Sequence, residues 1–113
     1  LAALGKRISL KVKNKSIETL IDISDILYIV KENTERKCTI ATRNKKYSVS
    51  KSLSDFEKDY GALLIRTHRC CLVNPKYVYE IDYATPMITF KSGIKLENMI
   101  SRNYKKQVQR LWN

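Results

Sequence analysis

Short runs in which apolar and polar residues alternate constrain the fold of this chain most. One such run covers Arg7–Lys13 and a second covers residues 17–21, with a turn expected at Asn14-Lys15 between them. Alternation with a period of two predicts half-buried β-strands. Because strand follows strand across short turns, without the long helices that connect parallel strands, the pattern excludes a doubly wound α/β fold.

The same criteria predict a mainly β domain of about eight to ten short strands with one or two short helices. The remaining strands are expected at Ile26–Val30, Arg36–Arg43, Tyr47–Val49, Leu63–Ile65, Cys70–Val73, Tyr77–Tyr83, Met87–Phe90 and Ile94–Leu96. Arg66–Arg69 is expected to be a polar loop. A helix is expected over 52–60, where Ser52 and Asp55 resemble a capping box and Gly61 resembles a stop. A basic C-terminal helix, capped by Ser101, should extend to about Trp112.

The domain organisation follows from length and composition. The chain has 113 residues, which is the size of one domain. We assign residues 6–113 to this domain and residues 1–5 to a terminal remnant or linker. The apolar runs are too short to span a bilayer, so no membrane partner is expected.

The charge of the chain indicates an anionic partner. Twenty-two Lys and Arg stand against eleven Asp and Glu, a net charge of +11 at pH 7. Three segments carry bases without acids: Arg36, Lys37, Arg43, Lys45, Lys46 and Lys51; Arg66, Arg69 and Lys76; and Arg102, Lys105, Lys106 and Arg110. One such segment alone is explained by a solvated surface. Three that converge in space would form an electropositive face suited to nucleic acid.

Catalytic and metal sites find little support in the sequence. No nucleophile or carboxylate pair stands at a spacing that identifies an enzyme, and we expect no cofactor and no small-molecule substrate. A zinc site from Cys38, His68, Cys70 and Cys71 lacks the spacing of zinc knuckles. Three cysteines, two of them adjacent, do not suit a disulfide framework, which favours a reducing cytoplasm.

Three motifs resemble those of LytTR-type DNA-binding domains. Residues 64–75 read Leu-Ile-Arg-Thr-His-Arg-Cys-Cys-Leu-Val-Asn-Pro, with the Arg-x-His element followed by a short apolar stretch and Val-Asn. Residues 100–104 resemble the family's last motif, in which a serine and an arginine open the final helix. Asp25–Ile29 is similar to its early strand. The resemblance covers the chain from about Lys6 to Leu111.

The resemblance implies a fold of roughly ten strands in small stacked sheets, elongated rather than barrelled. It implies sequence-specific binding of double-stranded DNA through loops that enter successive major grooves and bend the duplex. It also implies the role of output domain in a bacterial response regulator of a two-component system, behind an upstream receiver domain. Two copies would bind repeated sites.

The same resemblance selects the candidate site residues. Arg36, Arg69 and Arg102 are the candidate base-reading residues, and the planar fork of arginine suits guanine. Residues that would contact the DNA backbone or support the readers are Lys37, Arg66, His68, Ser101, Asn103, Lys105 and Lys106. Relatives can have His in place of Arg36 and Asn in place of Arg69, so the target sequence cannot be transferred from a relative.

A second function class stays open at this point. A charge-driven module could bind RNA or another polyanion without sequence specificity. The two classes differ in specificity, because a sequence reader binds its cognate duplex roughly 10³-fold or more over random DNA at the same salt concentration.

Overall fold

The computed structural model describes residues 9–33 and 36–112, with the side chains of residues 111 and 112 excepted. The described residues form ten strands: β1 Ser9–Asn14, β2 Ile17–Asp22, β3 Ile26–Lys31, β4 Cys38–Thr42, β5 Lys46–Val49, β6 Ile65–His68, β7 Cys71–Val73, β8 Val78–Asp82, β9 Met87–Phe90 and β10 Lys95–Glu97. Two α-helices, α2 Leu53–Tyr60 and α3 Lys105–Trp112, and three 3₁₀ turns, η1 Ile23–Asp25, η2 Pro75–Tyr77 and η3 Arg102–Tyr104, complete them. The predicted mainly β class is confirmed. The expected remnant at residues 1–5 lies outside the described residues.

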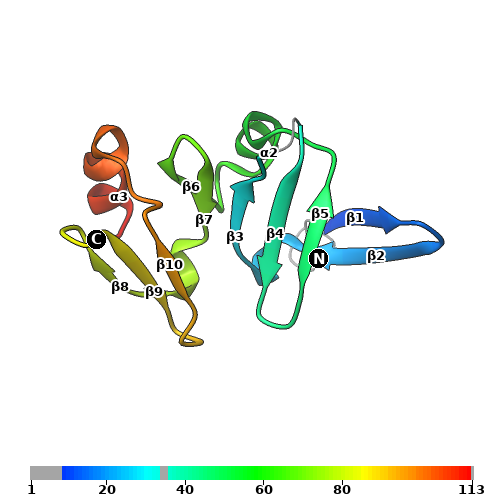
Figure 1. Ribbon diagram of the computed structural model, residues 1–113, viewed down its shortest axis with the longest axis horizontal. Helices are drawn as coiled ribbons and strands as arrows, with labels where there is room; N and C mark the ends of the chain where they lie inside the picture. The colour runs from blue at the N-terminus through cyan, green and yellow to red at the C-terminus, as the bar shows by residue number, and fades with distance from the viewer. Residues whose placement is uncertain (1–8, 34–35, 113) are drawn as a thin grey trace, which may run out of the picture.

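The strands form three antiparallel sheets that lie side by side without closing into a barrel (Figure 1). The largest has five strands in the order β5-β4-β3-β7-β6. A three-stranded sheet has the order β10-β9-β8, and β1 pairs with β2 as a hairpin. Within the large sheet β3 pairs with β7, from Tyr28 opposite Val73 to Val30 opposite Cys71. This pairing joins segments that are far apart in the sequence.

The five-stranded sheet separates two hydrophobic cores. On one face Ile26, Ile29 and Leu72 pack with residues of α2 and of the β1–β2 hairpin. On the other face Leu27 and Val73 pack with residues of the three-stranded sheet. Because both faces are covered, β3 reads as a continuous apolar run and does not alternate.

The β1–β2 hairpin is attached to the first core by one face. Val12 and Ile21 are buried there, whereas Leu20 on the outer face is 71% exposed. The turn between the strands lies at Lys15-Ser16, one residue later than predicted, and Lys15 has a φ of 57°.

The segment between α2 and β7 corrects one prediction. Arg66–His68 is not a loop, since β6 extends over Ile65–His68 and alternates between buried and half-buried residues. Ile65 and Thr67 are the buried residues of this strand. The strand was not predicted because its second buried residue is a polar threonine. Leu63 and Leu64, predicted as strand, instead lie between α2 and β6, with Leu63 in the turn after the helix.

Helix α2 begins and ends where the sequence predicts. The Ser52 hydroxyl accepts a hydrogen bond of 3.1 Å from the backbone N–H of Asp55. Gly61 ends the helix with right-handed dihedral angles (φ −61°) and not with the left-handed conformation of a typical glycine stop. A Cβ atom at this position would lie 2.6 Å from the Glu57 carbonyl oxygen, so close approach of the backbone explains the glycine.

Candidate nucleic-acid interface

Three irregular segments with basic side chains lie along one edge of the molecule, the upper edge in Figure 1. They are the loop between β3 and β4, the turn between β6 and β7, and the 3₁₀ turn η3 that precedes α3. We call these three segments the basic edge. The first two lie next to each other, because the N–H of Lys31, the last residue of β3, donates a hydrogen bond of 2.9 Å to the Cys70 carbonyl in the β6–β7 turn.

The β3–β4 loop presents Arg36 and Lys37, which are both exposed. Arg36 has a φ of 55°, in the left-handed region that residues with a Cβ rarely adopt. The loop is closed at its base by a hydrogen bond of 2.9 Å from the Glu32 N–H to the Lys37 carbonyl. Arg36 thus lies exposed beside the closed base of the loop.

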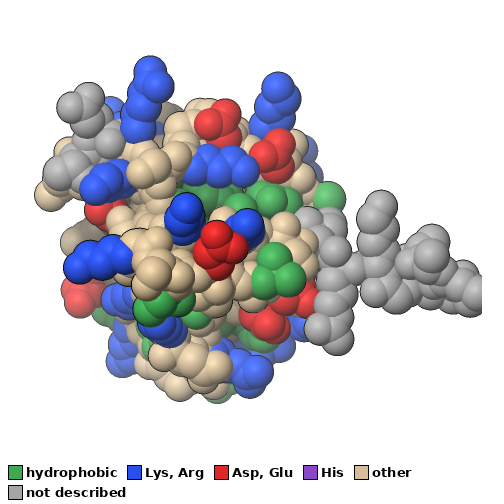
Figure 2. Space-filling model, turned by 90° about the vertical axis from the view of Figure 1, so that its right-hand side faces the viewer, with side chains coloured by type: hydrophobic (Ala, Val, Ile, Leu, Met, Phe, Trp, Pro, Cys, Tyr) green, Lys and Arg blue, Asp and Glu red, His purple; other side chains and the backbone are tan. Residues whose placement is uncertain are grey.

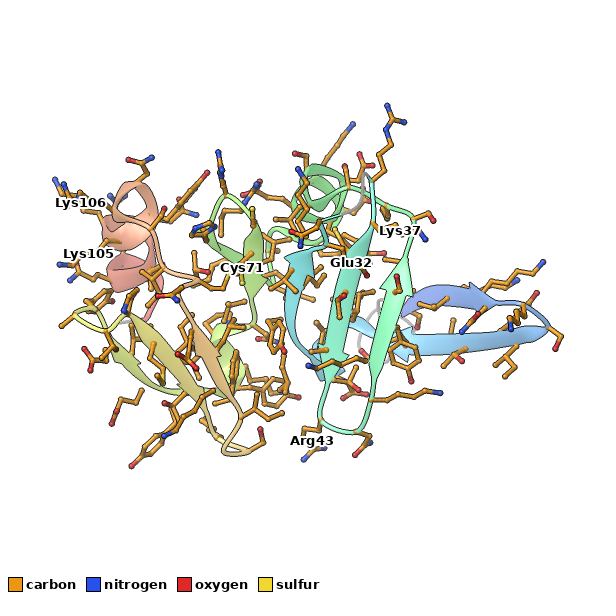
Figure 3. The ribbon with its side chains drawn as sticks, viewed as in Figure 1. Glu32, Lys37, Arg43, Cys71, Lys105 and Lys106 are labelled. Atoms are coloured by element: carbon orange, nitrogen blue, oxygen red, sulfur yellow. The ribbon has the colours of Figure 1, made fainter. Side chains whose placement is uncertain are left out.

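A carboxylate anchors the base of this loop. Glu32 Oε2 accepts hydrogen bonds from the hydroxyls of Thr39 on β4, at 2.8 Å, and Ser48 on β5, at 2.7 Å. The Ser48 and Thr39 hydrogen bonds and the nearby charge of Lys37 lower the pKa of Glu32. An acidic side chain can therefore lie within a basic region while its lone pairs are used inside the protein (Figure 3).

The β6–β7 turn presents Arg69, which is exposed. His68 precedes it, and its Nδ1 accepts a hydrogen bond of 3.1 Å from the Cys70 N–H. This bond fixes the imidazole ring on the turn and leaves Nε2 as the nitrogen that can meet a partner. The carbonyls of His68 and Arg69 accept hydrogen bonds from the Arg66 guanidinium.

A surface hollow brings two of the three candidate base readers together. Arg36 from the β3–β4 loop and Arg69 from the β6–β7 turn both line it, and Lys37 and Arg66 do so as well. The N-terminus of α2 contributes Ser52 and Ser54 to the same hollow, and β3 contributes Lys31. Lys31 was not predicted as a site residue, because it stands in an acidic stretch of the sequence. The first two basic segments thus meet in their residues that line this hollow.

Arg102 lies in a separate hollow at the start of the C-terminal segment. The other residues that line it are Tyr83, Ile100, Ser101 and Lys105. Arg102 and Asn103 are exposed, so both can meet a ligand. The structure therefore places the three candidate base readers in two sites, with Arg36 and Arg69 in one and Arg102 in the other.

Ser101 does not cap the final helix as predicted. Its side chain makes no capping hydrogen bond, and the 3₁₀ turn η3 comes before α3, which begins only at Lys105. The Ser101 N–H instead donates to the Thr67 carbonyl on β6 at 2.8 Å, which holds this segment against the sheet. The buried Ser101 hydroxyl oxygen has no hydrogen-bond partner among the described residues.

Helix α3 adds exposed cations beside Arg102. Lys105 and Lys106 are both exposed and project from the helix (Figure 3). The Lys105 ammonium lies 5.1 Å from the centroid of the Tyr83 ring, an arrangement that favours a cation. Partial burial raises the pKa of Tyr83, so at neutral pH this side chain is a neutral phenol.

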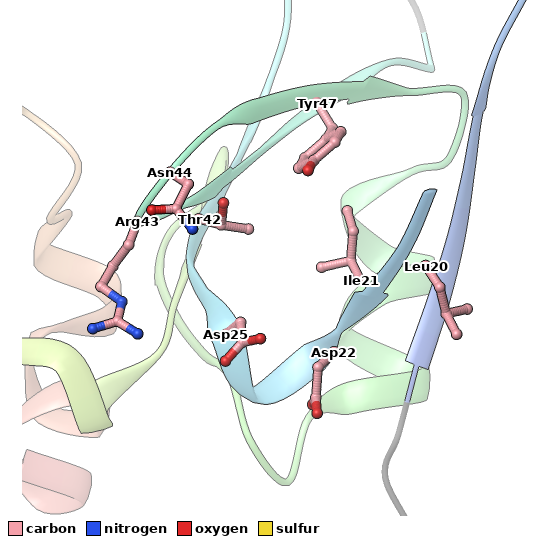
Figure 4. A pocket seen from close by; sticks show the side chains of 8 residues that line it. All are labelled: Leu20, Ile21, Asp22, Asp25, Thr42, Arg43, Asn44 and Tyr47. Carbon is pink, nitrogen blue, oxygen red and sulfur yellow. The ribbon is translucent and has the colours of Figure 1, made fainter. Parts of the chain in front are cut away.

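Other basic residues do not join the basic edge. Arg43, which the sequence groups with Arg36, lies at the opposite end of β4 (Figure 3). There it lines a hollow with Asp22, Asp25 and Tyr47 (Figure 4). The end of the molecule seen in Figure 2 shows Lys and Arg interspersed with acidic and hydrophobic side chains. The first basic segment therefore does not gather as a whole on the basic edge, since β4 separates Arg43 from Arg36.

The cysteines form no metal site in the described part of the chain. Cys38 and Cys71 are buried, and burial raises the pKa of Cys71 to about 12. Within residues 9–33 and 36–112, no three His, Cys, Asp or Glu side chains lie close enough to hold a metal ion together. None of the helices in those ranges is long and apolar enough to cross a membrane.

Comparisons with known proteins identify the family of this chain. The profile of the LytTr DNA-binding domain matches residues 10–113. No curated protein matches the sequence. Among solved structures, the LytTr DNA-binding domain of a putative methyl-accepting/DNA response regulator from Bacillus cereus is similar, with a TM-score of 0.77 and 20% identity. The match covers 95% of this chain and 97% of that one. At this identity the structural likeness establishes the fold, and the profile match establishes that this chain belongs to the family of LytTR DNA-binding domains.

Proposed function

We propose that this domain binds double-stranded DNA with sequence specificity and serves as the output domain of a bacterial transcription regulator. The observation that carries the proposal is the hollow in which Arg36 and Arg69 meet, although 32 intervening residues separate them in the sequence. Two exposed arginines on short, anchored segments suit the edges of guanine bases in a major groove.

The remaining candidate side chains would contact the phosphate backbone or support the base readers. Lys37 and His68 lie beside the two loop arginines, while Ser101, Asn103, Lys105 and Lys106 accompany Arg102. Because Arg36 and Arg69 lie in one hollow and Arg102 in another, we propose that the two sites enter successive major grooves. Two copies of the domain would occupy repeated half-sites, under the control of an upstream receiver domain in the cytoplasm.

Selection of bound sequences from a random duplex pool tests the proposal. We expect enrichment of a repeated half-site, and the selected duplex should bind roughly 10³-fold more tightly than random DNA at equal salt. A pool that stays unchanged after selection would contradict sequence reading and indicate a binder that recognises charge alone.

A salt series tests the contribution of the phosphates. With about six to ten phosphate contacts for two bound copies, the logarithm of affinity should fall with the logarithm of salt by about 0.9 per contact. Lys105→Ala combined with Lys106→Ala should weaken all duplexes about equally and make this slope shallower. A slope near zero for the unmodified protein would contradict a DNA-backbone interface.

A further inference from the structure

Arg66 occupies the junction between α2, the β6–β7 turn and the C-terminal segment. Its Nη1 donates to Glu57 Oε1 of α2 at 2.7 Å, and its Nε donates to the His68 carbonyl at 3.0 Å. Its Nη2 donates to the Arg69 carbonyl. All three nitrogens of the guanidinium thus have acceptors inside the protein.

This arrangement does not suit a residue that grips DNA. The Arg66 side chain is only 13% exposed, and its planar fork is already directed at two consecutive carbonyls of the turn. A duplex could recruit this guanidinium only by breaking hydrogen bonds to those carbonyls or to Glu57. Arg66 is therefore suited to hold the turn that carries Arg69.

The same strand also fixes the second site. The Arg66 guanidinium carbon lies 6.0 Å from the centroid of the Tyr104 ring in η3. The neighbouring residue, Thr67, accepts the hydrogen bond from the Ser101 N–H at 2.8 Å. Strand β6 is thus in contact with both the turn that carries Arg69 and the segment that carries Arg102.

We propose that Arg66 is a positioning residue for sequence reading. It sets the path of the β6–β7 turn, and thereby the direction of Arg69, without contacting DNA. Glu57 is its partner and keeps the guanidinium in the plane of the two carbonyls. This inference rests on the proposed function, because it assigns a residue that makes the specificity of that site.

The test compares Arg66→Lys with Arg43→Lys. Lysine keeps the positive charge at position 66 but cannot donate in one plane to both carbonyls and to Glu57. Arg43→Lys is the matched control, because it makes the same change at an exposed residue away from the basic edge. Affinities for the selected duplex and for random DNA are measured across a salt series, and circular dichroism reports the fold.

For Arg66→Lys we expect the ratio of selected to random affinity to fall about tenfold, at an unchanged salt slope and with affinity for random DNA within about twofold. The Arg43→Lys protein should keep the ratio of the unmodified protein. Glu57→Gln, which keeps a hydrogen-bond acceptor but removes the charge, should lower the ratio in the same direction by a smaller factor. If Arg66→Lys does not fold, the affinity ratio of Glu57→Gln tests the same proposal.

Three outcomes would overturn the inference. An unchanged ratio of selected to random affinity in Arg66→Lys would show that the β6–β7 turn does not depend on the planar guanidinium of Arg66. An equal loss of affinity for the selected and for the random duplex in Arg66→Lys would make Arg66 a phosphate contact. An unchanged ratio in Glu57→Gln, where Arg66→Lys does not fold, would exclude the support from α2. If the unmodified protein itself discriminates no duplex, the proposed function fails before Arg66 is tested.

Discussion

The β3–β4 loop and the β6–β7 turn leave the same edge of the five-stranded sheet, but they are anchored by opposite chemistry. In the β6–β7 turn a cation, Arg66, donates to backbone carbonyls. At the base of the β3–β4 loop a carboxylate, Glu32, accepts from hydroxyls on two strands. In both cases the anchoring side chain satisfies its polar groups within the protein. Arg36 and Arg69, for which the described residues offer no such bonds, remain directed outward.

The two loops differ in the contacts that fix them. The β6–β7 turn is held by side-chain hydrogen bonds to its own backbone, so its shape depends on Arg66 and His68. Among its described residues, the β3–β4 loop is held at its base, and Arg36 bears an unfavourable φ of 55°. We therefore expect changes in the shared support to affect both loops and changes at the arginines to affect them differently.

The largest effect should come from Phe56→Ala, which removes the support that both loops share. Phe56 is fully buried between α2 and the sheet, and α2 supplies Glu57 to Arg66. Loss of a buried phenyl ring costs about 3–5 kcal/mol of the free energy of unfolding. Urea unfolding measures this loss. Lys58→Ala, an exposed change on the same helix, should stay within about 0.5 kcal/mol, and a similar loss in both variants would contradict the assignment.

The next largest effect should be a loss of DNA affinity that distinguishes Arg36 from Arg69. Arg36→Ala and Arg69→Ala should each cost about 1–3 kcal/mol on the selected duplex and relax the preference at different base positions. Circular dichroism should show an intact fold, because both side chains are exposed. Relaxation at the same position in both variants would show that the two arginines do not read separate bases. An equal loss on random DNA would make them phosphate contacts.

Glycine, compared with alanine, should change stability in opposite directions at positions 36 and 69. At position 36 the Gly variant should be more stable than the Ala variant by about 1 kcal/mol, because glycine adopts a positive φ without a steric cost. Position 69 has no positive φ, so there the Gly variant should be less stable than the Ala variant by about 0.4–1 kcal/mol. Urea midpoints of the four variants decide this. If the Gly and Ala variants had the same order of stability at both positions, backbone strain at Arg36 would be excluded.

The smallest effect concerns pH and tests the carboxylate of Glu32. Because folding lowers the pKa of Glu32 from its ordinary value of 4.5, its contribution to stability is present above that value. It is lost as the pH falls through the lower pKa of the folded state. The unmodified protein should be more stable than Glu32→Gln at pH 7, and the difference should shrink below about pH 4.5. Thermal unfolding at several pH values measures it, and a constant difference would contradict the prediction.

The sequence was sufficient for the strands that obey a simple pattern and insufficient where tertiary contacts decide. Alternation and apolar runs located most strands, since burial on one or two faces leaves that signature. The strand at Ile65–His68 escaped because Thr67, a polar residue, is buried. The predicted cap at Ser101 was wrong because the backbone of that residue pairs with Thr67, a contact between distant parts of the chain.

The candidate site shows the same limit. The exposed loop positions of Arg36, Arg69 and Arg102 were predictable from their places near turns and motifs. The meeting of Arg36 with Arg69, and the separation of Arg43 from both, depends on the order of strands in the sheet. No local pattern encodes that order, because β3 and β7 become neighbours only through contacts formed over a long stretch of chain.

The pairing of β3 with β7 also governs when the domain acquires its shape during folding. The two loops of the basic edge become neighbours only after about forty residues of intervening chain have been closed into a loop, an entropic cost that precedes any gain from contacts. A growing polypeptide that has not yet released Val73 from the ribosome lacks the strand that completes the sheet centre. Such a nascent chain already carries Arg36, but the hollow that Arg36 shares with Arg69 forms only after β7 has paired with β3.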